Sequence, residues 1–283
     1  MTTQTQMPSM HEVPTAAVTR TLDPTALRDS FLVPNLFVDG AVSLRLIALD
    51  RAIIGGIVPT HGALELGAPD AIGAAYFTER REVAVLNIGS AGTVQVDGET
   101  FTLASCDMLY IGRGSKAITF ASEHAGTPAR FYLVSYPAHV RYPTRLVRRA
   151  DASLATLGAV DTANQRELRK YVYPGGVESA QLVMGVTEMQ TGSVWNTMPP
   201  HTHMRRSEIY LYFALPADAA VVHLMGEAAA TRSLMVHNEQ AVLSPPWSIH
   251  AGCGTQAYAF CWAMGGENQD FADMQPAPIS TLR

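Results

Sequence analysis

From about residue 31 onward, short apolar runs alternate with turn residues. The runs are rich in Val, Ile, Leu, Tyr and Phe and recur at spacings of roughly ten residues, a pattern typical of an all-β sandwich or barrel. Asp97-Gly98 lies between two alternating runs and predicts a tight hairpin. The predicted strands lie in residues 43–49, 74–79, 82–88, 92–104, 107–112, 117–122, 129–136, 179–189, 208–215, 219–226, 232–238, 241–246 and 256–266.

The strand pattern is interrupted around residue 150. Residues 149–175 lack strand alternation, are rich in Ala and Leu, and run into a Pro-Gly-Gly turn, so we predict a short helical connector there. A β unit of residues 28–148 precedes the connector, and one of residues 176–283 follows it. Residues 1–27 are polar, contain no apolar block and are predicted to form a flexible N-terminal arm.

The two β units resemble each other in pattern. ERREVAVLNIG (79–89) and RRSEIYLYFAL (205–215) both place Arg-Arg just ahead of a Glu that opens an apolar run, and DMLYIGRGSKA (107–117) occupies the same relative place as AVLSPPWSIHA (241–251). We therefore predict an internal duplication in which Glu82 corresponds to Glu208.

Composition and charge narrow the class of protein. The chain has 283 residues, 47% of them hydrophobic and 16% charged, which describes a globular protein. A formal net charge of −5 provides no basic field for nucleic acid. No stretch of 18 uncharged apolar residues is present, so we expect no membrane span. The three scattered cysteines, Cys106, Cys253 and Cys261, fit a reducing cytoplasm better than a disulfide framework.

The segment PPHTHMRRSEIYLYF (199–213) contains candidate metal ligands. His201 and His203 are two apart, so in a strand both point to one face and their imidazoles can share an ion. Glu208 has the wrong parity for that face, and a bend through residues 204–207 is needed to bring it to the same ion. After the bend, Glu208, Tyr210 and Tyr212 share one face.

His250 is the candidate for a fourth ligand. It follows the run AVLSPP and a short turn, and Pro245 stands five residues before it. His-x-His, a following Glu and a later Pro-x-x-x-x-His resemble the two metal motifs of cupin barrels, the double-stranded β-helix or jelly-roll fold. Imidazole and carboxylate ligands suit Zn, Mn, Fe, Ni or Co.

The remaining candidates have simpler interpretations. No ligand type lies at metal spacing from His223 or His237, which we expect to be core or rim histidines. Cys253 and the other histidines are interpreted in the same way: His11, His61, His124 and His139. In the first unit, the proposed alignment puts Ala75 and Phe77 at the places of His201 and His203, and Lys116 or Ala117 at that of His250. We therefore expect one metal ion per chain, bound by the second unit.

Longer segments resemble one family of cupins, the bacterial 5-keto-4-deoxyuronate isomerases, also called 4-deoxy-L-threo-5-hexosulose-uronate ketol-isomerases. The resemblance covers nearly the whole chain after about residue 25, and GSVWNTMPPHTH and WSIHAG are its specific motifs. Four positions near the candidate site depart from the family pattern: Met204, Ser207, Ala230 and Ser233. The matching segments are residues 31–37, 50–59, 77–98, 107–116, 181–213, 237–255 and 262–274.

The resemblance implies a fold, a cofactor and a reaction. It implies two tandem cupin barrels and a hexamer, with one zinc ion bound through the residues that match His201, His203, Glu208 and His250. The implied enzyme is an aldose-ketose isomerase of pectin and oligouronide degradation, which converts 5-dehydro-4-deoxy-D-glucuronate to 3-deoxy-D-glycero-2,5-hexodiulosonate.

Such a reaction requires a base, an electrophile and a group that holds the substrate carboxylate. Zinc is adequate as the Lewis acid because no redox step is needed. Arg206 shares a face with Glu208 in an extended chain and is a candidate for the carboxylate. Tyr210 is a candidate for orienting substrate or relaying a proton. The sequence identifies no catalytic base.

Two other hypotheses about function are compatible with the same candidate residues. One is another cupin enzyme, such as a 5-deoxyglucuronate isomerase or an iron-dependent dioxygenase, and the other is a non-catalytic sugar-binding cupin. Bound iron with oxygen consumption distinguishes the dioxygenase, and a basic helix-turn-helix segment, which the sequence does not show, would favour a regulatory cupin.

Overall fold

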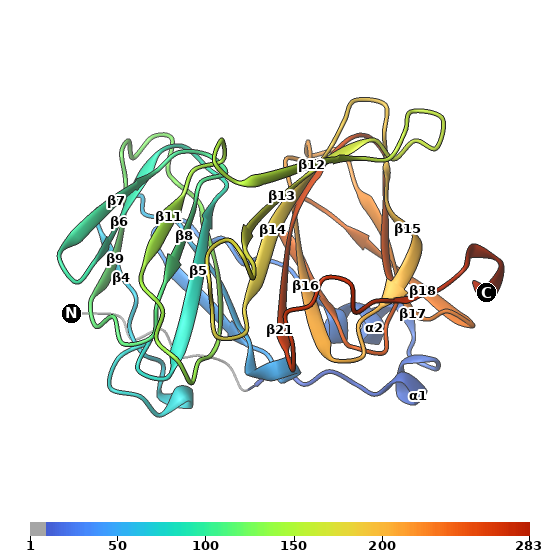
Figure 1. Ribbon diagram of the computed structural model, residues 1–283, viewed down its shortest axis with the longest axis horizontal. Coiled ribbons are helices and arrows are strands. Elements are labelled where there is room, and N and C mark those ends of the chain that lie inside the picture. Colours follow the sequence, from blue (N-terminus) through green and yellow to red (C-terminus); the bar gives the residue numbers. More distant parts are fainter. Residues whose placement is uncertain (1–9) are drawn as a thin grey trace. The chain divides into compact units, whose positions relative to one another are not determined.

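Strands make up nearly all the regular structure of residues 10–283, the part of the chain that the computed structural model describes. The prediction of an all-β fold is therefore confirmed. The strands belong to two units (Figure 1). The first contains Leu36–Ala152 and Tyr171–Val183, and the second contains Glu12–Asn35, Ser153–Lys170 and Met184–Arg283. Within residues 10–283, no helix has the length and apolar character needed to span a bilayer.

The first unit consists of two antiparallel sheets and two short 3-10 helices. Its elements are β2 (Val42–Leu46), η1 (Leu49–Arg51), β3 (Ile53–Ile57), β4 (Leu64–Glu65), η2 (Asp70–Ile72), β5 (Arg81–Asn87), β6 (Gly92–Val96), β7 (Glu99–Leu103), β8 (Met108–Ile111), β9 (Ile118–Ser122), β10 (Phe131–Pro137) and β11 (Arg145–Val147). One sheet has the strand order β11-β8-β5-β10-β3-β2, and the other has the order β4-β9-β6-β7.

The hairpin predicted at Asp97-Gly98 is confirmed. It joins β6 to β7 and places Val96 opposite Glu99. Asp97 has a φ of 49° and Gly98 a φ of 92°, and tight hairpin turns favour Asp-Gly because their central residues need positive φ.

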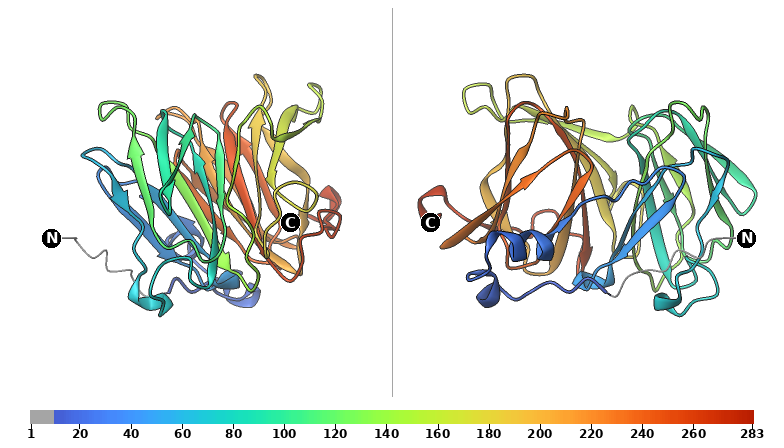
Figure 2. Two further views of the ribbon diagram at one scale, coloured as in Figure 1. Left: turned by 60° about the vertical axis from the view of Figure 1, so that its left-hand side comes forward. Right: turned by 180° about the vertical axis from the view of Figure 1, so that it is seen from behind.

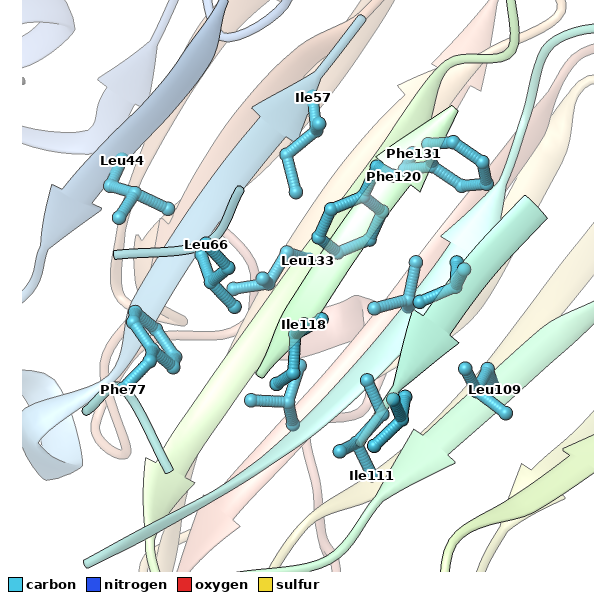
Figure 3. Packing of buried hydrophobic residues seen from close by; sticks show 14 of the residues in the cluster. Leu44, Ile57, Leu66, Phe77, Leu109, Ile111, Ile118, Phe120, Phe131 and Leu133 are labelled. Atoms are coloured by element: carbon cyan, nitrogen blue, oxygen red, sulfur yellow. The ribbon is translucent and has the colours of Figure 1, made fainter. Parts of the chain in front are cut away.

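The core of the first unit lies between its two sheets. Alternate residues of β5, Val83 and Val85, face this core, and Leu133 of β10 lies in it together with Phe120 of β9. Figure 3 shows Ile118 and Phe120 close to Leu133. Full burial of one such aliphatic or aromatic side chain contributes about 1.5–3 kcal/mol.

The second unit also contains two antiparallel sheets. Its elements are α1 (Ala16–Thr19), α2 (Pro24–Phe31), β1 (Leu32–Val33), β12 (Ser153–Leu157), β13 (Arg166–Val172), β14 (Val183–Met189), β15 (Trp195–Thr202), β16 (Arg206–Phe213), β17 (Val221–Glu227), β18 (Ala230–Val236), β19 (Gln240–Ser244), β20 (His250–Gly254), β21 (Ala259–Gly266), β22 (Gln275–Pro276) and η3 (Ile279–Thr281). The sheet orders are β1-β19-β16-β21-β14-β13-β12 and β18-β17-β20-β15-β22.

The strand orders of the two units support the predicted duplication. The run β8-β5-β10-β3-β2 of the first unit has the same connectivity as β19-β16-β21-β14-β13 of the second. The run β4-β9-β6-β7 likewise matches β15-β20-β17-β18. The site-bearing strands β15, β16 and β20 therefore have counterparts β4, β5 and β9.

The prediction of a flexible arm over residues 1–27 is wrong for its helical part. Helix α2 begins after Asp23, whose side chain accepts a hydrogen bond of 2.8 Å from the Ala26 N–H, as an N-cap residue does. Leu27 and Phe31 of this helix are buried, and Leu32 of β1 pairs with Val242. Figure 2 shows the segment in dark blue. Residues 1–9 of the predicted arm lie outside the described part of the chain.

The predicted helical connector over residues 149–175 is also wrong. Strands β12 and β13 lie in this range and pair antiparallel, with Ala155 opposite Leu168. The Ala- and Leu-rich composition favoured a helix, but β13 lies next to β14 in the seven-stranded sheet. Pairing with a neighbouring strand overrode the weak local propensity.

Candidate metal centre

The four predicted ligands converge in the second unit. The Nε2 atom of His201 lies 3.0 Å from the Nε2 atoms of both His203 and His250. An oxygen of Glu208 lies 3.1 Å from Nε2 of His203 and 3.2 Å from Nε2 of His250. All four ligand atoms are within 4.8 Å of one another. This is the only cluster of three or more potential ligand residues within the described residues 10–283.

Strand pairing and one turn produce the convergence. His201, near the end of β15, pairs directly with His250, the first residue of β20. The ladder between β15 and β20 is irregular between Asn196 and His201, and such irregularities redirect side chains. The predicted bend is present, because the Arg206 N–H donates to the His203 carbonyl at 3.1 Å and β16 begins there.

Burial and the electrostatic interactions among the four side chains shift the pKa values of the cluster. Burial, together with the neighbouring His203, lowers the pKa of His201 to about 4, and burial lowers the pKa of His250 well below its usual value. Burial alone would raise the pKa of Glu208, but the three histidines outweigh it and lower this pKa to about 2. At neutral pH the side chains of His201, Glu208 and His250 are therefore deprotonated.

A divalent metal ion fits this arrangement. Ligand atoms about 2.1 Å from a shared ion lie about 3.0 Å apart at an angle near 90° and about 3.4 Å apart at the tetrahedral angle, and the neighbouring atoms of the cluster lie 3.0–3.2 Å apart. Three imidazole nitrogens and one carboxylate oxygen form a ligand set that suits zinc and other transition metals.

Two side chains orient the ligand rings from behind. The Ser244 hydroxyl lies 3.2 Å from Nδ1 of His250, and Nη2 of Arg206 lies 3.0 Å from Nδ1 of His203. Arg206 is 1% exposed, and its guanidinium also donates to Asn268 and to the carbonyl of Asp273. Partners of metal-bound histidines control ring orientation and metal affinity.

Aromatic and polar groups line the interior beneath the cluster. Burial and the nearby Glu208 carboxylate raise the pKa of the Tyr210 hydroxyl well above its usual value, and Tyr210 follows Glu208 by two residues on β16, which places both on one face of the strand. One step further along, the Tyr212 hydroxyl lies 2.7 Å from Nδ1 of His223. His223 is completely buried, as expected for a core histidine.

Sequence reasoning did not find all the polar groups near the site. Arg166, Asn268 and Asp273 had no motif to indicate them. Arg166 is the first residue of β13 and interacts electrostatically with the hydroxyls of Tyr258 and Tyr210. Its Nη1 donates to the Asn164 carbonyl at 2.8 Å, and its place near these tyrosines was not predictable because β13 was not recognised as a strand.

The first unit has apolar side chains at the matching places. Val83 of β5 pairs with Ile111, the last residue of β8, as Glu208 pairs with Ser244, the last residue of β19. Leu64 pairs with Phe120 between β4 and β9, where the second unit pairs His201 with His250. Among residues 10–283, the potential metal-ligand cluster lies in the second unit alone, and the expectation of one metal ion per chain stays a prediction.

The residue correspondences predicted between the two units are wrong, because the strand register differs from the one that the sequence pattern suggested. Val83, not Glu82, takes the place of Glu208, and the positions assigned to Ala75, Phe77, Lys116 and Ala117 lie outside the strands β4 and β9. A one-residue slip moves a side chain to the other face of a sheet. Glu82 accepts hydrogen bonds from the backbone N–H groups of residues 180–182 and, at 2.7 Å, from the Tyr110 hydroxyl.

The fold and the cluster define the class of protein. Paired antiparallel sheets with three histidines and one glutamate facing inward are features of a cupin with a candidate metal centre. More specifically, the chain belongs to the KduI/IolB family, which matches residues 48–277.

Curated relatives agree with this assignment. A protein of Caldicellulosiruptor bescii is 48% identical over 257 residues, covering 91% of this chain and 93% of its own. One of Opitutus terrae is 48% identical over 275 residues, covering 97% and 99%. Both are named 4-deoxy-L-threo-5-hexosulose-uronate ketol-isomerase. The chain is therefore an isomerase of the ketol-isomerase type, as predicted.

Solved structures support the fold. An IolB-like protein of Salmonella typhimurium superposes with a TM-score of 0.66 at 12% identity, covering 80% of this chain and 87% of that one. An oxalate decarboxylase of Lactobacillus farciminis superposes with a TM-score of 0.57 at 10% identity, covering 84% and 88%. At such low identity these similarities establish a shared fold and nothing about the reaction.

Proposed function

We propose that the protein is a zinc-dependent isomerase that converts 5-dehydro-4-deoxy-D-glucuronate to 3-deoxy-D-glycero-2,5-hexodiulosonate during oligouronide degradation in the cytoplasm. The main observation concerns the four proposed metal ligands, His201, His203, Glu208 and His250. Their neighbouring ligand atoms lie 3.0–3.2 Å apart. Relatives of 48% identity bear the name of this reaction. The three cysteines are free, as expected in a reducing compartment.

The ion would supply Lewis acidity to the substrate carbonyl, which stabilises negative charge that develops beside it. The protein contributes orientation and a defined protonation state. Burial and the nearby Glu208 raise the pKa of Tyr210 well above its usual value, so its hydroxyl stays protonated at neutral pH. We therefore assign Tyr210 the role of a hydrogen-bond donor that orients substrate beside Glu208, rather than that of the base.

Metal removal tests the proposed chemistry. Complete chelation should reduce turnover at least about 100-fold, since Lewis-acid stabilisation contributes several kcal/mol. Conversion of the keto-deoxyuronate can be followed by NMR, with the metal content of the same samples measured by mass spectrometry. Re-addition of one equivalent of zinc per chain should restore activity. Turnover that survives full metal removal would refute a metal-dependent mechanism, and oxygen consumption with iron would instead identify an oxygenase.

The substrate carboxylate requires a cation. Arg206 was predicted for this role, but its guanidinium is occupied by His203, Asn268 and Asp273, and we propose that it orients His203. Arg166 is half-buried and interacts electrostatically with Tyr210 inside the same unit. We therefore propose Arg166 as the group that binds the carboxylate.

Two arginine variants distinguish these roles. Arg166→Met should raise the KM at least about tenfold through the loss of a charge-assisted hydrogen bond, while the bound metal stays at one equivalent. Arg206→Met should instead lower the metal content, because His203 loses its orienting partner. The KM and the metal content of both variants should be measured in parallel. If Arg206→Met keeps one equivalent of metal and shows a raised KM, Arg206 and not Arg166 binds the substrate carboxylate.

We also propose that the chain forms a homo-oligomer, a hexamer by resemblance to its family. Strand β12 is the last strand of its sheet, and Leu154 on it is 53% exposed, with Val160 beyond it 75% exposed. Unpaired strand edges with apolar side chains favour association with another chain. Light scattering of the purified protein should give a mass of about six chains, and a monomer mass at micromolar concentration would contradict this.

A further inference from the structure

The first unit contains a cavity that the isomerase site does not use. Its volume is about 200 Å³, and its lining includes Arg51, Arg80 and Arg81 together with apolar residues such as Leu46 and Ile72. No lining residue is acidic. Arg80 lies 3.6 Å from the Glu79 carboxylate, so the positive charge around this cavity exceeds the negative charge chiefly through Arg51 and Arg81, in a chain whose net charge is −5.

Arg81 is the buried member of this group. Its side chain donates to the Ser135 hydroxyl at 3.0 Å and to the carbonyls of Ser135 and Arg51 at 2.9 and 2.6 Å. Among residues 10–283, neither an acidic partner for the Arg81 guanidinium nor a hydrogen-bond acceptor for its Nη1 is present. Arg81 is only 7% exposed, and a buried guanidinium usually has a carboxylate or another anion as its partner.

Burial is the main cause that lowers the pKa of Arg81 to about 10, with a smaller contribution from the nearby Arg51 and an opposing one from Tyr136. The side chain therefore stays charged at neutral pH. A bound anion would compensate this charge and accept hydrogen bonds from the free Nη1.

The backbone beside the cavity is held in an unfavourable conformation. Asp50 and Arg51 have consecutive φ values of 46° and 56°, in the left-handed region that costs a non-glycine residue of order 1–3 kcal/mol. This conformation brings the Arg51 carbonyl to Arg81 and leaves the Arg51 side chain in the cavity lining. Such conformations persist where the surrounding structure requires them, often at ligand sites.

The cavity lies at the strand end that corresponds to the candidate metal centre. Arg81 opens β5 two residues before Val83, as Arg206 opens β16 two residues before Glu208. The first unit has therefore kept a buried arginine at this end of the strand, although apolar residues replace the metal ligands.

We infer that the first unit binds a small oxyanion, a carboxylate or a phosphate, in the cavity formed around Arg51, Arg80 and Arg81. Arg81 contacts the anion through Nη1, and Arg51 and Arg80 contribute charge from the exposed rim. A volume of about 200 Å³ equals roughly six or seven water volumes, which admits phosphate or the carboxylate end of a sugar acid but not a nucleotide.

Calorimetric titration of the zinc-loaded protein tests this inference, with inorganic phosphate and D-galacturonate as separate probes. We expect one site per chain in addition to any anion bound at the metal centre. The double variant Arg51→Gln/Arg80→Gln should weaken this site about tenfold or more, because it removes two charges from exposed positions. Arg81→Lys keeps a charge without the planar guanidinium and should also weaken it.

His203→Ala is the matched control because it disturbs the metal centre and leaves the cavity intact. Binding that persists in this variant and is lost in the arginine variants supports the inference. Binding that is lost in His203→Ala, or that is unchanged in Arg51→Gln/Arg80→Gln, would overturn it, as would no binding of either probe. Binding of only phosphate or only the sugar acid identifies the class of anion. Neither outcome depends on isomerase activity.

Discussion

Replacing His203 with alanine is expected to remove the bound metal and to reduce turnover by about a thousandfold or more. The Nε2 atom of His203 contacts both His201 and Glu208 in the cluster, so its loss removes one of four ligands and one of the two histidine contacts to the Glu208 carboxylate. Loss of about 4 kcal/mol of Lewis-acid stabilisation corresponds to roughly a thousandfold in rate.

The matched control for His203→Ala is His237→Ala. His237 belongs to the same unit but is exposed and lies outside the cluster, so this variant should keep one equivalent of metal and wild-type turnover. Metal content by mass spectrometry and turnover by NMR should be measured for both, with circular dichroism to verify folding. A folded His203→Ala protein that keeps its metal and its activity would contradict the assignment of the centre.

The second large effect concerns acid stability and depends on His223. Burial lowers the pKa of this histidine to about 4, whereas an unfolded histidine has a pKa of about 6.5. Between these values the unfolded chain binds one more proton than the native one. The free energy of unfolding should therefore fall as pH decreases from about 6.5 to about 4, by about 3 kcal/mol from this residue. The contribution is fully present above pH 6.5.

His223→Gln removes this titration and retains a hydrogen-bonding side chain for Tyr212. Urea unfolding of the metal-free wild type and variant at a series of pH values between 7 and 4 should give a shallower pH dependence for the variant. The difference in slope should approach about 1.4 kcal/mol per pH unit inside the window. Equal slopes for the two proteins would show that His223 is not held neutral in the native state.

The candidate ligands were predictable because metal-binding residue types occur at short, characteristic separations in the sequence. His201 and His203 share a strand face, and the odd separation to Glu208 required the bend that the turn before Arg206 provides. The Asp97-Gly98 hairpin was likewise predictable, because its positive φ values favour those residue types. Asp23 followed by Pro24 was also a local signal, for the start of α2, and it was overlooked.

Other features depend on partners that are distant in the sequence. Residues 153–172 have a composition that favours a helix, yet they form β12 and β13 because β14 offers an adjacent strand. Glu82 looked equivalent to Glu208 because both follow a pair of arginines, but pairing with β8 places Val83 at the equivalent position. Register depends on the neighbouring strand, which a single run of residues does not specify.

The sequence by itself determined the all-β class, the four ligand residues and the family resemblance, since each is expressed in residue types at short spacing. Only the tertiary structure decided that Arg206 supports His203, that the first unit has an apolar interior at the matching places, and that Arg81 is buried without an acidic partner among residues 10–283. These properties arise from contacts between residues tens of positions apart, and neither their distances nor their burial leaves a periodic signal in the chain.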